Sequence, residues 1–270
     1  MRSFGVLTAT IALALFYSAC STVSPGPSAA PESLQLQDRS AQVQQLTRKV
    51  AERDRALRSM QTDAVMAYTS PDRHPPKVRE QITAKRPDSL RVEAMSAFSV
   101  ALILATSGKH LAIFEPSKNK LVRAAATADT LNQFIQIPMA PADAVTLLLG
   151  IAPDSTSLAD RKPDTIAAED DMTVASWTMA LGARRQLGFR DDQLVMVRAR
   201  DATGAIEYEV RYSEYQDLGG LMFPYMVEAS FPVAQSRVSF HYKRPIINGD
   251  VPDSTFVLSP PPNQQANANP

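Results

Sequence analysis

The sequence predicts an α+β fold that is mainly β, with one large antiparallel sheet of about eleven to thirteen strands and a few helices. Short segments with strand character follow one another along most of the chain, separated by turns that contain Pro, Gly, Asn and Asp. Strands this close in sequence are joined by hairpins, so neighbouring strands must run antiparallel. An antiparallel sheet of this size normally curls, and we therefore expect a curved sheet.

The first expected element is a helix. Its apolar residues recur at spacings of three, four, seven and three positions with charged residues between them: Val43, Leu46, Val50, Leu57 and Met60. A short coiled coil stays open, but the pattern covers fewer than three heptads. We expect the helix to pack on the domain's own sheet.

A first group of strands follows this helix. Turn-forming residues at 70–72, 86–88, 107–108 and 116–119 divide the group into hairpins. The expected strands are Thr62–Thr69, Pro76–Lys85, Ser89–Met95, Val100–Thr106, His110–Glu115 and Lys120–Ala125.

Two helices then interrupt the strands. Thr127 is a candidate N-cap for the first helix. In the second helix, Pro141 suits the first turn, Asp143 complements the N-terminal dipole and Gly150 suits the C-cap. Strands resume after these helices, and they are expected at Thr173–Leu181, Arg184–Phe189, Leu194–Ala199, Ile206–Tyr212, Phe223–Phe231 and Ser236–Tyr242, with a last short one near Phe256.

One strand is apolar on both of its faces. The segment from Val100 to Ala105 shows no alternation of apolar and polar residues, so both faces must contact something apolar. One face can belong to an ordinary core. For the other face, the two helices after Thr127 and a hydrophobic ligand are both candidates, and periodicity does not choose between them.

Both ends of the chain differ in composition from its middle. Arg2, the apolar stretch 5–17 and the small residues 18–19 have the arrangement of an export signal. About 13 apolar residues are too few to span a hydrocarbon core of roughly 30 Å. We expect a signal peptide at 1–19, a flexible tether at 20–33, a folded domain at 34–258 and a disordered tail at 259–270.

Cys20 is the only cysteine of the sequence and directly follows the expected signal. A lone cysteine at this place resembles a bacterial lipobox, in which the thiol is lipidated and becomes the new N-terminus. Tyr17 departs from that pattern, which usually has Leu three residues before the cysteine. Two other interpretations stay open: an ordinary secretory signal with an incidental thiol, and a soluble protein with an apolar start.

Composition argues against several classes of function. Lys plus Arg and Asp plus Glu both number 28, whereas a nucleic-acid binder normally has a basic excess. The histidines, His74, His110 and His241, lack metal-ligand spacing, and the sequence has neither a nucleophile elbow nor a Gly-rich phosphate loop. The acidic run 169–171 lacks the spaced oxygens of a calcium loop and is interpreted as a solvated loop. We expect no enzymatic activity, no cofactor and no metal site.

The stretch from Pro87 to Pro153 resembles the LolB-like outer-membrane lipoproteins of the LolA/LolB lipoprotein-localisation superfamily. The matching segments, in chain order, are 89–95, the loop 96–99, 100–105, the hairpin through 107–109, the helix 131–138 that ends in Ile-Pro, and the Leu-rich helix 142–150. A weaker match at 253–260 resembles the end of the sheet in the related periplasmic carrier LolA.

The resemblance implies an incomplete, half-open antiparallel β-barrel of about eleven strands, with helices that cover a hydrophobic cavity for acyl chains. The residues expected to line that cavity are Val92, Leu102, Leu104, Ile113, Leu131, Phe134, Leu148, Trp177, Val195 and Val227. Each of these side chains is equally compatible with an ordinary core.

The resemblance also implies a membrane-insertion loop. In the family, a loop between two early strands carries an exposed apolar residue that enters the membrane, and Phe98, next to Ala97, occupies that place here. The family loop often reads Asn-Pro-Leu-Gly, and neither Pro nor Gly is present. Phe98 folded back into the core is the alternative. Ser21 after the lipidated Cys20 suits outer-membrane sorting.

The leading functional hypothesis is a monomeric, lipid-anchored acceptor at the periplasmic side of the outer membrane. By the resemblance, its partners are acylated lipoproteins, a LolA-type periplasmic carrier and outer-membrane lipid. The alternative hypothesis is an envelope lipoprotein that does not transport and uses the same fold to sense or hold a lipid or a protein. An enzyme would need convergent polar groups in the cavity, and the sequence offers no candidates.

Overall fold

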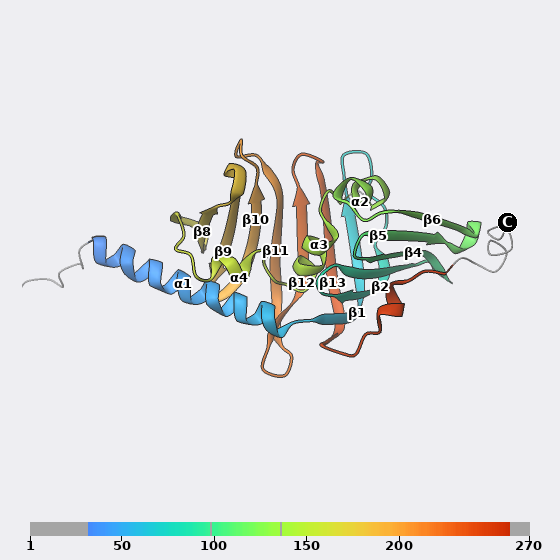
Figure 1. Cartoon of the computed structure of the whole chain (residues 1–270), viewed down its shortest axis with the longest axis horizontal. Coiled ribbons are helices and arrows are strands. Elements are labelled where there is room, and N and C mark those ends of the chain that lie inside the picture. Colours follow the sequence, from blue (N-terminus) through green and yellow to red (C-terminus); the bar gives the residue numbers. More distant parts are fainter. Residues whose placement is uncertain (1–31, 98, 136, 260–270) are drawn as a thin grey trace, which may run out of the picture.

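The computed structural model describes residues 32–97, 99–135 and 137–259, and its strands form one curved antiparallel sheet (Figure 1). The strands are β1 (Ser59–Thr69), β2 (Val78–Lys85), β3 (Ser89–Met95), β4 (Val100–Ser107), β5 (His110–Glu115), β6 (Lys120–Ala125), β7 (Thr165–Glu169), β8 (Met172–Thr178), β9 (Arg184–Arg190), β10 (Gln193–Arg200), β11 (Ile206–Asp217), β12 (Met222–Phe231) and β13 (Ser236–Ile247). The α-helices are α1 (Glu32–Ala56), α2 (Ala128–Ile135), α3 (Pro141–Leu148) and α4 (Ser155–Leu158), and the 3-10 helices are η1 (Pro116–Lys118), η2 (Ala180–Gly182) and η3 (Asp253–Phe256).

The order of the strands explains why the barrel stays open. The 13-stranded sheet runs β6-β5-β4-β3-β2-β1-β13-β12-β11-β10-β9-β8-β7, so the first and last strands of the chain pair in its middle. Its two edges, β6 and β7, follow each other in sequence, and the connection between them carries α2, α3 and α4. The predicted half-open antiparallel barrel with helices is therefore confirmed. Strand β7 and helix α4 were not expected from the sequence.

Helix α1 packs on the sheet, as predicted. Val43, Leu46 and Val50 are buried in the same core as Trp177 of β8 and Phe189 of β9, and the helix crosses β8 to β11 in Figure 1. The prediction was wrong at its end, because α1 stops at Ala56 and Met60 lies in β1. Met60 is nevertheless buried in that core, so its apolar side chain belongs to the core face of β1 and not to the helix.

The predicted helix caps are confirmed. The Thr127 hydroxyl accepts a hydrogen bond from the Thr130 N–H at 3.2 Å, and Pro141 occupies the first turn of α3. Gly150 follows the last turn of α3 with a φ of 68°. A side chain at Gly150 would also meet the ring of Pro224, whose Cγ lies 2.6 Å from the position of a Cβ.

The C-terminal segment covers the outer face of β3 and β4. The prediction of a last strand near Phe256 was wrong. This residue ends the 3-10 helix η3, which lies against both strands, and its side chain is buried. Arg91 of β3 donates a hydrogen bond to the Thr255 carbonyl at 3.0 Å. The C-terminal segment thus covers part of the outer face of β4, where Ala105 is buried, while Ala101 at the start of the strand stays exposed. Neither the helices nor a ligand, the two candidates considered from the sequence, covers this face.

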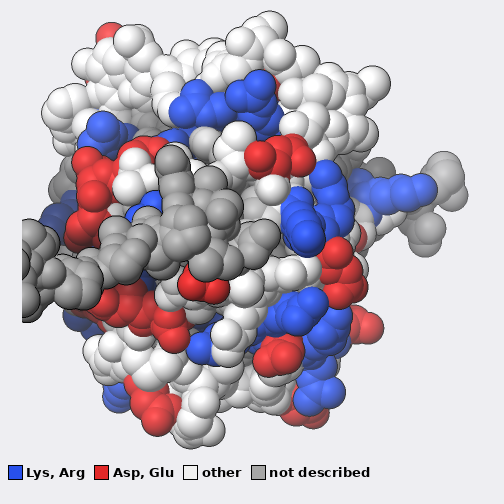
Figure 2. Space-filling view, turned by 90° about the vertical axis from the view of Figure 1, so that its left-hand side faces the viewer, with Lys and Arg blue, Asp and Glu red and all other residues white. Residues whose placement is uncertain are grey.

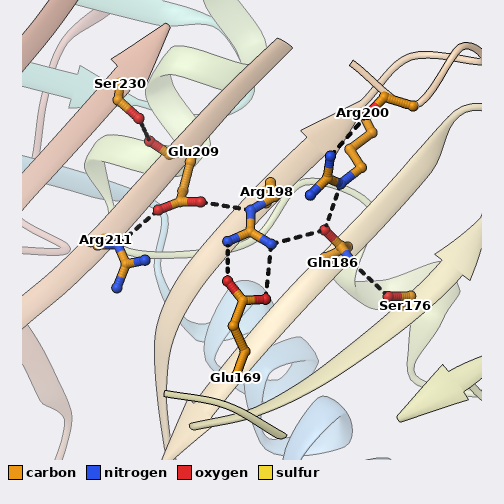
Figure 3. A network of polar contacts seen from close by, with 9 residues as sticks. Glu169, Ser176, Gln186, Arg198, Arg200, Glu209, Arg211 and Ser230 are labelled. Atoms are coloured by element: carbon orange, nitrogen blue, oxygen red, sulfur yellow. Dashed lines mark hydrogen bonds and ion pairs between the residues drawn. The ribbon is translucent and has the colours of Figure 1, made fainter. Parts of the chain in front are cut away.

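A polar network binds the edge strand β7 to the outer face of the sheet (Figure 3). The Arg198 guanidinium of β10 contacts Glu169 of β7 and Glu209 of β11, each at 2.6 Å, and Gln186 of β9 at 3.2 Å. The Arg198 side chain is only 6% exposed, and its hydrogen bond lowers the pKa of the Glu169 carboxyl. The acidic run 169–171 is therefore not simply a solvated loop, because its first residue pairs with this arginine.

Arg198→Leu is expected to lower the free energy of unfolding by about 1–2 kcal/mol, since two carboxylates lose their shared partner. Arg198→Lys, which keeps the charge but not the forked geometry, should lose about half as much. Urea unfolding of both variants measures the difference. An unchanged midpoint in Arg198→Leu would show that the network does not stabilise the edge.

Charges of both signs are mixed on the end of the molecule where α1 begins. Figure 2 shows Lys and Arg side chains interspersed with Asp and Glu side chains on that end, with uncharged residues over its upper part. The described part of this face therefore presents no field of a single sign.

A cavity between the sheet and its helices

A cavity of about 530 Å³ lies between the inner face of the sheet and the helices α2 and α3. This volume is within the range of roughly 300–1,000 Å³ that is usual for small-molecule sites. Its wall comes from β1 to β4, from β11 to β13, and from the segment 131–148. The apolar lining residues are Met66, Pro75, Ile82, Leu90, Val92, Ala94, Leu102, Leu104, Leu131, Ile137, Met139, Ala144, Leu147, Leu148, Val210, Val227, Ala229, Phe231, Val238 and Phe240.

Strand register explains how the cavity floor is formed. Tyr242, Ala64, Glu80, Ala94 and Leu102 lie side by side across five neighbouring strands. Glu80, Ala94 and Leu102 of this row line the cavity, and the small side chain of Ala94 leaves space above the sheet that a larger one would fill. The floor is therefore hollow at the β2–β4 end of this row.

Helices α2 and α3 form the roof of the cavity, and two tyrosines of the sheet are hydrogen-bonded to α3. Tyr242 of β13 donates a hydrogen bond to the Leu148 carbonyl at 2.9 Å, and Tyr212 of β11 donates to the Leu147 carbonyl at 3.1 Å. These carbonyls belong to the last turn of α3, where carbonyl groups take partners from outside the helix, and the Leu147 carbonyl also accepts the Gly150 N–H. Burial raises the pKa of both tyrosines well above its usual value, so both hydroxyls keep their protons. The C-terminal end of α3 is thereby held at a defined height above the sheet.

The structure brings six of the ten residues expected at the cavity together on its wall. They are Val92, Leu102, Leu104, Leu131, Leu148 and Val227. Phe134 lies in α2, but its side chain is outside the described part of the structure, as are Cys20, Ser21 and Phe98. The neighbouring Ala97 is exposed.

The other three expected residues lie away from the cavity. Trp177 is 0% exposed in the core that α1 and α4 fill, and its indole N–H donates to the Arg161 carbonyl at 3.3 Å. Ile113 of β5 packs with Leu104, Leu111 and Leu131 in a small separate cluster. Both side chains point to the inner face, but helices already cover that face at their positions.

Val195 packs with Met172, Val174 and Met196 instead of lining the cavity. Simple alternation along β10 does not predict this position. The pairing of β10 with β9 shifts between Leu194 and Met196, which marks an irregularity at Val195. Because one extra residue reverses the faces of a strand, Leu194 and Val197 enter the core and Val195 does not.

The wall also contains polar residues that sequence reasoning missed: Tyr68, Arg73, Glu80 and Gln133. Glu80 is the most deeply buried of them, with 6% of its surface exposed. Burial raises the pKa of its carboxyl to about 7. A signal was present, because Glu80 alternates in phase with Ile82 and Ala84, the inward residues of β2.

Within residues 32–97, 99–135 and 137–259, none of the helices combines the length and the apolar composition that a membrane span requires. Across the same ranges, no group of three or more His, Cys, Asp or Glu side chains is placed to hold a metal ion.

Comparison with solved structures identifies the architecture. A LolA superfamily protein from Nitrosomonas europaea superposes with a TM-score of 0.52 at 15% identity, over 78% of this chain and 97% of that one. The fold is that of the LolA superfamily. No protein-family model matches the sequence, and no curated protein matches it significantly.

Two further structures share this LolA-type fold. A DUF1329 family protein from Desulfovibrio piger has a TM-score of 0.56 at 10% identity, over 79% of this chain and 95% of that one. An outer membrane lipoprotein-sorting protein domain from Vibrio parahaemolyticus has a TM-score of 0.51 at 6% identity, with the same coverage of both chains. At these identities the similarity establishes the LolA-type fold alone.

Proposed function

We propose that this protein is a lipid-anchored acceptor that binds the acyl chains of lipoproteins in its cavity and helps to insert them into the outer membrane. The observation that carries the proposal is the cavity itself, an aliphatic space between a curved sheet and two short helices. The LolA-type fold and a structural neighbour named for lipoprotein sorting support the same proposal.

The physics of the cavity suits a carrier of acyl chains. Each CH₂ group removed from water contributes roughly 0.8 kcal/mol, so an acyl chain crosses an aqueous space only inside an apolar container. Delivery also requires that binding be reversible at the membrane. Movement of α2 would open the cavity while the two tyrosine hydrogen bonds keep the end of α3 in place.

The proposal is tested by asking whether the full chain, held in lipid nanodiscs, captures an acylated lipoprotein from a loaded LolA-type carrier. The matched control is the same lipoprotein without its acyl chains. Capture that requires acylation supports the acceptor role. A folded chain that captures neither form would contradict the acceptor role. That result would favour the alternative hypothesis, an envelope lipoprotein that does not transport and senses or holds a lipid or a protein.

Phe98→Glu is expected to reduce insertion of captured lipoprotein into liposomes by about tenfold, because a carboxylate resists entry into the membrane interface. Capture from the carrier should stay unchanged. Val233→Glu is the matched control, because Val233 is an 81% exposed apolar residue on another hairpin. Equal insertion by the two variants would remove Phe98 from the delivery step.

A further inference from the structure

One buried carboxyl in the cavity wall has no hydrogen-bond partner within the part of the chain that the structure describes. Glu80 Oε2 is fully buried, and the described residues provide no hydrogen bond to it. Nearly all buried polar side-chain atoms in proteins are hydrogen-bonded, because an unpaired one loses its contacts with water without replacement. Because Glu80 lines the ligand-sized cavity, a donor on the ligand is a candidate for the missing partner of its carboxyl.

The neighbours of Glu80 cannot supply that group. Across the sheet it is flanked by Ala64 of β1 and Ala94 of β3, which have no polar side-chain atoms. Tyr242 is the next residue of the row, but its hydroxyl hydrogen is given to the Leu148 carbonyl. Arg73 lines the same cavity from the β1–β2 turn, but among the described residues it is not a partner of Glu80 Oε2.

We propose that Glu80 accepts a hydrogen bond from the ligand, so that the cavity selects acyl chains whose head carries an N–H or O–H group. The inference rests on the proposed function, which places acyl chains in this cavity, and it adds the chemistry of the atom next to the chain. An amide-linked chain or a hydroxylated head satisfies Glu80, whereas a simple ester offers only acceptors.

Selection of this kind is strong because a ligand without a donor leaves the buried Glu80 carboxyl unpaired. A site with a buried polar group rejects the analogue that lacks the complementary group, since the group then stays unpaired. The raised pKa of Glu80, about 7, agrees with this view, because it reports a carboxylate without stabilising donors.

The test uses three ligands with equal chains of sixteen carbons: hexadecanamide, hexadecanol and methyl palmitate. Each competes at pH 8 with a diazirine-bearing palmitoyl probe that photolabels the full chain in nanodiscs. For each variant, the ratio of the ester concentration to the amide or alcohol concentration that competes is measured. Partition into the lipid contributes equally to this ratio in every variant, so a change in the ratio between variants isolates the site. In the wild-type chain, the amide and the alcohol should compete at concentrations about tenfold lower than the ester.

Variants of Glu80 assign that ratio to its carboxyl. Glu80→Leu should bring the ratio down to the value set by partition alone, and Glu80→Gln should also lower it, because the glutamine amide can donate to the ester carbonyl. Glu228→Leu is the matched control, because Glu228 is an exposed glutamate on β12. An amide that competes and an alcohol that does not would narrow the proposal to N–H donors and overturn its O–H part.

Two results would overturn the inference in different ways. A folded Glu80→Leu chain that keeps the wild-type ratio contradicts the role of Glu80 and leaves acyl binding intact. Absence of competition by any ligand in the wild-type chain contradicts the proposed function as well. If Glu80→Leu does not fold, the wild-type ratio at pH 5.5 decides, because a protonated Glu80 can donate to the ester and the ratio should fall, while that of Glu80→Gln stays constant.

Discussion

Ala94→Trp is expected to abolish photolabelling by the palmitoyl probe, with at least a tenfold loss of binding. Ala94 is half-buried on β3, lines the cavity and lies next to Glu80 in the hollow row of the floor. An indole placed there occupies the space that an acyl chain would take. Because the side chain enters a cavity and not a packed core, the cost of overpacking should be small.

The control for this variant is Ala101→Trp. Ala101 is an exposed residue of the neighbouring strand β4 and is absent from the cavity wall. Both variants should keep the free energy of unfolding of the wild-type chain, measured in urea, within about 1 kcal/mol. Retained photolabelling in a folded Ala94→Trp chain would mean that acyl chains bind somewhere else, and the proposed site would have to be abandoned.

Glu80→Gln is expected to stabilise the chain without ligand at alkaline pH, by an amount that disappears in acid. The pKa of Glu80 is raised from 4.5 to about 7 by burial, so between these values the folded state holds a proton that the unfolded state releases. The wild-type free energy of unfolding therefore falls as the pH rises from 4.5 to 7. The total change attributable to this group is on the order of 3 kcal/mol.

Glutamine does not titrate, so the difference between the two chains isolates Glu80. Urea unfolding at pH 5 and at pH 8 should show the variant gaining about 2–3 kcal/mol relative to the wild-type chain between the two conditions. A constant difference would show that Glu80 has the same pKa in both states, and hence that solvent or another donor reaches it. A saturating ligand with an N–H group should reduce the difference by the same reasoning.

The local elements could be predicted from the sequence with good accuracy because their causes are local. Turn residues bounded the hairpins, and Thr127, Pro141 and Gly150 marked helix ends through capping geometry that involves only a few neighbouring residues. Strand β7 was missed because residues 165–169 carry little apolar signal. It is held at the edge by Arg198, which lies far along the chain.

The cavity could be predicted only in part. The family resemblance correctly indicated that Val92, Leu102 and Leu104 line the cavity, but an inward-facing side chain does not always line a space. Trp177 faces inward too, and α1 with α4 fills the space above it. Which inward residues meet a helix and which meet a cavity depends on where distant segments cross the sheet.

By itself the sequence determined the antiparallel order of neighbouring strands, the curved sheet and the places of α2 and α3, because hairpin spacing and capping act over short distances. Only the tertiary structure decided the pairing of β1 with β13, the covering of β4 by the C-terminal segment and the presence of an unpartnered Glu80 in the wall. These features arise between residues that are far apart in sequence, so no local pattern records them. Burial is a property of the assembled sheet and helices, and it is burial that makes the cavity and its carboxyl a candidate site.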